Sequence, residues 1–171
     1  MIRRVDFKKA VLAGALGAVA WETAMRPLIW LGLPMFDLVY SLGTVALGSD
    51  SVFWQWWPAG MSMHIMVGSI WAVFYAYFFW SMFDRPPAVQ GIIFSLVPIV
   101  LAGVVMVPQM DYMNTEVLAG RMTAHGFFAS QAGLGGPAGL ILGHLVYGAV
   151  MGGIYRKPVG YPAGKKVVRY G

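Results

Sequence analysis

The chain has 171 residues, of which 58% are hydrophobic and only 11% are charged, and its mean hydropathy is +0.66. Soluble domains contain roughly 45–50% apolar and about 25% charged residues, so this composition argues against a soluble enzyme, a disordered tail and a nucleic-acid-binding domain. The absence of cysteine excludes disulfides, thiolate zinc sites, cysteine-ligated iron–sulfur clusters and covalently attached c-type haem, and the net charge of +5 suits a membrane protein with one basic side.

Four segments are long and apolar enough to cross a membrane, which takes about 20 residues. They cover residues 10–31, 61–83, 88–107 and 137–155. Only the first contains formal charges, Glu22 and Arg26. The pattern predicts an all-α protein, a four-helix transmembrane bundle that forms a single domain over residues 1–171.

The lysines and arginines indicate the orientation of this bundle. Ten of the 12 lie before the first segment, in the turn at residues 84–87, or after the last segment. Basic residues favour the cytoplasmic side of membrane proteins, so we expect both termini and this turn to be cytoplasmic. Residues 158–171 then form a basic cytoplasmic tail.

Three further segments are predicted on the outer side. The apolar residues between Phe36 and Leu47 recur at helical spacing, which favours a helix along the interface. The aromatic residues at 53–57 resemble an interfacial anchor before the second segment. The glycine-rich residues 133–139 favour a flexible turn that leads into the fourth segment.

Three motifs occur twice in the same order. Pro34-x-x-Asp37 matches Pro108-x-x-Asp111, and a Pro-Ala-Gly opens the second and fourth segments. The third motif is His64-x3-Gly68-x3-Ala72-x2-Tyr75, which matches His144-x3-Gly148-x3-Gly152-x2-Tyr155. We therefore expect two parallel two-helix repeats, at about 10–83 and 88–157, related by an axis along the membrane normal.

Small residues in the third motif lie on one helix face and predict close packing. Positions i, i+4 and i+8 fall on one side of a helix, and small side chains there let two backbones approach. We expect these faces to meet each other or a neighbouring helix. The residues are Gly68, Ala72, Gly148 and Gly152.

The last segment carries a family resemblance. It has the form His-x-x-Tyr-Gly-x-x-x-Gly-x-x-Tyr from His144 to Tyr155, which resembles the last helix of a group of small, uncharacterised bacterial four-span membrane proteins. The Pro-x-x-Asp motif and the residues from Met106 to Pro108 are also similar to that group. The resemblance implies a multi-pass protein of the bacterial inner membrane and no established activity. The chain departs from the group in its Trp-rich first outer loop and its long second outer loop.

Charged residues inside a membrane are costly and mark candidate functional sites. Glu22 and Arg26 are four residues apart, so they share a helix face and can pair. With Asp37 and Asp111 they form a candidate intramembrane polar site. It could be a structural ion pair, or the proton or ion relay of a small transporter.

The repeated histidines, His64 and His144, allow three interpretations. Each imidazole could lock the bundle by a hydrogen bond to a carbonyl, Asp37 or Asp111. The pair could ligate a b-type haem across the pseudo-twofold axis. A copper site could instead use Met61, Met63, His64 and Met66, because thioether and imidazole ligands suit Cu(I).

The sequence shows no nucleophilic motif, because Ser62, Ser69 and Ser130 have no recognisable acid–base partners. We therefore expect a non-enzymatic integral membrane protein, an accessory or assembly subunit of a larger membrane complex. Its expected partners are the lipid bilayer and other membrane subunits or a second copy, with no nucleic acid. A redox module using His64 and His144, and a small transporter using Glu22 and Arg26, are the alternatives.

Overall fold

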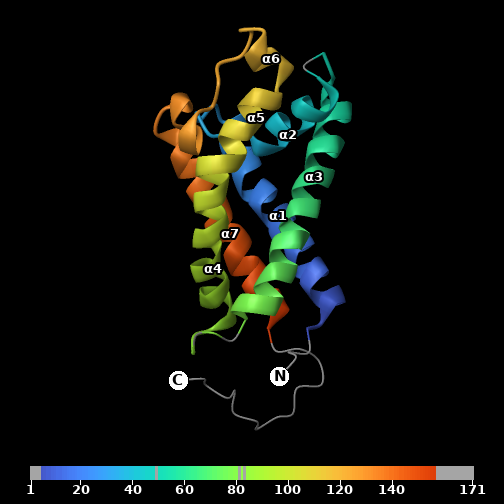
Figure 1. The fold of residues 1–171 in the computed structure, drawn as a ribbon, viewed down its shortest axis with the longest axis vertical. Coiled ribbons are helices and arrows are strands. Elements are labelled where there is room, and N and C mark those ends of the chain that lie inside the picture. The colour runs from blue at the N-terminus through green and yellow to red at the C-terminus, as the bar shows by residue number, and fades with distance from the viewer. Residues whose placement is uncertain (1–4, 49, 81, 83, 157–171) are drawn as a thin grey trace.

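Helices make up the fold, and no β-strand occurs in the part of the chain that the structure describes, residues 5–48, 50–80, 82 and 84–156 of a computed structural model (Figure 1). The all-α prediction is confirmed. The α-helices are α1 (Phe7–Trp30), α2 (Leu38–Leu47), α3 (Phe53–Phe74), α4 (Pro87–Leu101), α5 (Val107–Met113), α6 (Thr115–Leu118) and α7 (Gly135–Tyr155). Wider π-helical turns at Tyr75–Phe79 and Ala102–Met106 extend α3 and α4, and a short 3-10 segment covers Phe127–Ala132.

Three continuous helical stretches of the described chain are long and apolar enough to cross a membrane. They are Phe53–Phe79, Pro87–Met113 and Gly135–Tyr155, and their length and composition agree with the prediction of a membrane protein. Helix α1 has 24 residues and is therefore about 36 Å long. It also carries Glu22 and Arg26, and it packs lengthwise against α3 and α7.

The long helices run between two ends of the molecule. Figure 1 shows the first turn of α1, the connection from α3 to α4 and the last turn of α7 at one end, with α2, α5 and α6 at the other. Helix α2 begins at this other end because the Asp37 carboxylate caps it, accepting a hydrogen bond from the Tyr40 backbone N–H at 2.9 Å.

Several predicted boundaries differ from the structure. The aromatic residues 53–57 form the first turns of α3, and α7 begins at Gly135 inside the predicted glycine-rich turn. The third stretch continues past Pro108 to Met113. A proline lacks an N–H and crowds the carbonyl four residues earlier, and the wider turn at Ala102–Met106 accommodates this within a continuing helix.

The two Pro-x-x-Asp motifs have different local structures. Asp37 stands at the N-terminus of α2 after a non-helical connection, whereas Asp111 lies inside α5. The predicted repeat therefore does not extend to the structure around these aspartates.

Glycine contacts join the helices within pairs. A Cβ atom at Gly14 of α1 would overlap the backbone of Gly68 in α3, and a Cβ atom at Gly91 of α4 would overlap the backbone of Gly148 in α7. The glycine faces of α3 and α7 thus pack on α1 and α4 respectively, and these close approaches require glycine.

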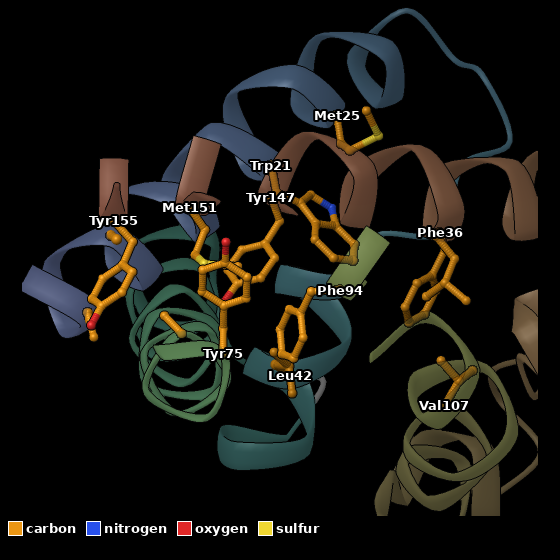
Figure 2. Packing of buried hydrophobic residues seen from close by; sticks show 14 of the residues in the cluster. Trp21, Met25, Phe36, Leu42, Tyr75, Phe94, Val107, Tyr147, Met151 and Tyr155 are labelled. Atoms are coloured by element: carbon orange, nitrogen blue, oxygen red, sulfur yellow. The ribbon is translucent and has the colours of Figure 1, made fainter. Parts of the chain in front are cut away.

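Aromatic and methionine side chains fill the centre of the bundle. Trp21, Tyr147 and Met151 follow one another along the core, and Tyr155 lies at its far end (Figure 2). The rings of Tyr75 and Tyr155, which match in the sequence motif, meet edge to face with centroids 6.0 Å apart. These contacts link α3 and α7, which have little direct backbone packing.

Candidate functional site

A cavity of about 260 Å³ lies between α3 and α4, in the half of the bundle nearest α2 and α5. We call it the lateral cavity. Helix α3 forms one wall and α4 with its π-helical turn forms the other, while α1 and α7 form the back. The residues that line it include Trp21, His64, Val67, Leu101, Val105, His144 and Tyr147.

Buried side chains border the lateral cavity at one end, and exposed side chains border it along α4 and the turn that follows. Leu42 of α2 and Met110 of α5, both buried, line it at one end. Toward the other end, the ring of Phe94 packs against Trp71 with centroids 6.0 Å apart. Leu101 and Val105 line the cavity and are yet exposed on the α4 surface.

The two predicted histidines meet at the back of the lateral cavity. The indole of Trp21 contacts both imidazoles edge to face, with ring centroids 5.1 Å from His64 and 4.4 Å from His144. Both histidines are more than nine-tenths buried. Glycine at position 143 makes these ring contacts possible, because a Cβ atom there would overlap the Trp21 ring.

The hydrogen bonding of the two imidazoles differs. Nδ1 of His144 lies 2.8 Å from the carbonyl oxygen of Leu140, one turn earlier in α7. No residue in the described ranges forms a hydrogen bond with His64. The predicted hydrogen bond to a backbone carbonyl is therefore present for His144. Asp37 and Asp111 form their hydrogen bonds with residues other than these two histidines.

The four predicted copper ligands do not converge on one point. Met61 and His64 are buried, whereas 56% of Met66 is exposed on the opposite face of α3. Of the four, only His64 lines the lateral cavity. Adjacent positions on a helix point about 100° apart, which separates Met63 from His64.

The predicted pairing of Glu22 with Arg26 is present and includes Asp37. Nε of Arg26 donates to Glu22 at 2.6 Å, and its two terminal nitrogens donate to the Asp37 carboxylate at 2.5 and 2.8 Å. The Trp57 indole N–H also donates to Glu22 at 3.2 Å. Because two carboxylates surround one guanidinium, this arginine cluster holds α1, α2 and α3 together at one end.

A second cavity of about 300 Å³ adjoins the arginine cluster. Trp30, Phe53 and Trp57 line it beside Glu22 and Arg26. The polar atoms of the cluster thus border open space on one side, although Glu22 and Arg26 are themselves buried.

Asp111 belongs to a network that sequence reasoning missed. Its carboxylate lies 2.6 Å from Nδ1 of His125 and accepts the backbone N–H groups of His125 and Gly126 at 2.9 Å. Nε2 of His125 lies 3.2 Å from the hydroxyl of Ser41. Ser41 and His125 are 84 residues apart, and no local pattern connects them.

The order serine, histidine and aspartate matches that of a nucleophilic triad, but the surroundings of Ser41 favour a structural role. Ser41 is only 1% exposed and does not line either cavity. Its hydroxyl also donates to the carbonyl oxygen of Asp37 at 2.9 Å, so one proton serves two acceptors. The network ties the loop after α6 to α2.

Comparisons of the chain with protein families, with curated proteins and with solved structures found no match.

Proposed function

We propose that this chain is a non-enzymatic integral membrane protein, an accessory or assembly subunit that holds an apolar guest for a larger membrane complex. In this proposal the guest enters the lateral cavity from the plane of the membrane. Charge placement supports four crossings with both termini in the cytoplasm, and the family resemblance supports the bacterial inner membrane.

The shape of the lateral cavity carries the proposal. Buried Leu42 and Met110 line one end, and the exposed apolar residues Leu101 and Val105 line the side that faces α3, where we place the opening. A cavity that opens sideways receives molecules dissolved in lipid, whereas a transporter or a hydrolase of soluble substrates needs access from water. Concave, mostly apolar sites with few polar groups are typical of ligand binding.

A matched pair of variants on α3 tests the proposal. Val67→Trp places a large ring in the lateral cavity, while Ile70→Trp adds the same ring on the exposed face nearby. Native mass spectrometry of protein purified in mild detergent measures what each variant retains. We expect wild type and Ile70→Trp to carry a small molecule and a protein partner, and Val67→Trp to lose the small molecule.

The proposal fails if wild type is a homogeneous monomer with neither bound molecule nor partner protein. A fluorophosphonate probe tests the non-enzymatic part separately. We expect no labelling of Ser41, because its hydroxyl is buried and already bonded. Labelling that is lost in Ser41→Ala would instead identify a serine hydrolase.

The alternatives have their own tests. A haem or copper module predicts a Soret band or a metal in the purified protein, lost in His144→Phe. A small transporter or proton relay predicts proton-coupled transport in vesicles that is lost in Glu22→Gln, and the cavity beside the arginine cluster is the observation that favours it. The haem interpretation uses His64 and His144, which line the lateral cavity, whereas the transporter does not require that cavity.

A further inference from the structure

The lateral cavity contains an acceptor that nothing in the described chain satisfies. The carbonyl oxygen of Leu140 can only accept, so the close contact at 2.8 Å requires the hydrogen of His144 to reside on Nδ1. Burying a charged imidazole among apolar side chains is costly, and a neutral ring with hydrogen on Nδ1 has a bare lone pair on Nε2. No residue in the described ranges donates to that nitrogen. A guest with a hydroxyl group would satisfy it.

His64 is a second polar side chain of the lateral cavity, and its tautomer, unlike that of His144, is not fixed. It lines the same cavity, it is only 6% exposed, and within the described residues it has no hydrogen-bond partner. Its tautomer is therefore free, and the ring can donate to an oxygen or accept from one. Since Trp21 contacts both imidazoles, the two polar side chains lie close to one indole.

The dimensions of the lateral cavity limit the guest to a small ring system. An engineered apolar cavity of about 150 Å³ binds benzene, and the volume here is about 260 Å³. One substituted ring, or two fused rings, fits this space. The opening beside Leu101 and Val105 leaves a route by which an apolar tail could remain in lipid.

We propose that the lateral cavity binds the hydroxylated ring of a membrane-soluble quinol or phenol, with one hydroxyl donating to Nε2 of His144 and a second oxygen contacting His64. The ring lies against Trp21 and Tyr147 at the back of the cavity. This inference rests on the proposed binding function and adds the chemical class of the guest. It assigns a binding step only, with no electron transfer.

Menadiol and its oxidised form, menadione, are matched probes for this proposal. They share one fused ring skeleton, and only the diol has hydroxyl hydrogens to donate. Titration calorimetry in detergent without oxygen measures both affinities, and naphthol provides a third probe with a single hydroxyl. We expect menadiol to bind wild type roughly tenfold more tightly than menadione, because only the diol satisfies the bare acceptor.

His144→Phe is the diagnostic variant, because it keeps a ring of similar size and removes the acceptor. We expect it to bind menadiol and menadione equally, while Ile70→Trp keeps the wild-type preference and Val67→Trp binds neither. If naphthol binds as tightly as menadiol, one hydroxyl is sufficient and the guest is a phenol.

Two results would overturn the inference. If wild type binds menadione at least as tightly as menadiol, the guest is not recognised by a donated hydrogen, although the binding function stands. If His144→Phe keeps the preference, or cannot fold while His64→Phe folds and abolishes it, His144 is not the acceptor. If no probe binds wild type and no small molecule co-purifies with it, both the inference and the binding function fail.

Discussion

The side of the bundle where α1 meets α7 and the side where α3 faces α4 are built differently. Between α1 and α7, aromatic rings lie directly on glycines: Tyr147 covers Gly17, and Trp21 covers Gly143. Between α3 and α4, the rings of Trp71 and Phe94 meet at one end, and the lateral cavity occupies the space beyond them. At the spacing of the sequence motif, Val67 of α3 occupies the place that Tyr147 has in α7.

This difference shows how a membrane protein closes one helix interface and leaves another open. Lipid tails are as apolar as the side chains, so helices associate through close packing rather than by removal from water. A large ring on a glycine provides that packing. A valine at the corresponding place does not, and the two helices stay apart.

The largest expected effect on stability comes from removing a large ring between α1 and α7. Trp21→Ala removes a ring that is 4% exposed, and we expect it to lower the free energy of unfolding by about 3–5 kcal/mol. Trp71→Ala, beside the open cavity, is half-buried and should cost roughly 1 kcal/mol. Denaturant unfolding in mixed micelles measures both. Equal losses would contradict the distinction between the two sides.

Glycine packing between α4 and α7 predicts the next effect. A Cβ atom at Gly148 would overlap the backbone of Gly91, whereas one at Gly153 would meet only the Ala88 side chain at 4.0 Å. We expect Gly148→Ala to destabilise the protein by about 1–3 kcal/mol and Gly153→Ala to be neutral or slightly stabilising. The same unfolding measurement applies, and a neutral Gly148→Ala would mean that the helices lie farther apart.

One hydrogen bond joins the closed side to the wall of the cavity. The Tyr147 hydroxyl donates to the carbonyl oxygen of Gly68 at 2.6 Å. We expect Tyr147→Phe to cost about 1 kcal/mol, because the carbonyl remains in the helix and loses only its additional partner. The control is Tyr77→Phe on the exposed surface, which should leave the unfolding midpoint unchanged.

Placing a large ring in the lateral cavity between α3 and α4 should have the smallest effect on stability. Val67→Trp places its ring in existing space, so we expect the free energy of unfolding to change by less than about 1 kcal/mol, below the usual cost of overpacking. A loss of several kcal/mol would show that the space is not available to a side chain. Thermal unfolding in micelles, compared with Ile70→Trp, gives the answer.

Length and hydropathy were sufficient to predict the helical class and the three stretches that are apolar enough to cross a membrane, whereas the first predicted segment, residues 10–31, is not among these three. The pairing of Glu22 with Arg26 also followed from helical spacing alone. The predicted helix boundaries near two prolines were wrong, because Pro58 and Pro108 lie inside continuous helical stretches rather than at their ends. A proline in a long apolar helix is tolerated where neighbouring turns adjust, and no local pattern reveals that.

The site was predictable only in part, because its contacts join residues far apart in the chain. The repeated motif identified His64 and His144, but it could not show that Trp21 contacts both. The link from Ser41 to His125 joins α2 to the loop after α6. Such contacts depend on which helices are neighbours, and hydropathy does not contain that information.

A photoactivatable apolar probe dissolved in the bilayer tests the lateral opening most directly. Peptide mass analysis after illumination locates the labelled residues. Our account predicts labels on the buried back wall, at His144 and Tyr147, and their loss in Val67→Trp but not in Ile70→Trp. Labels confined to outward-facing residues such as Ile70 and Leu96 would show that lipid-phase molecules do not enter, and would contradict it.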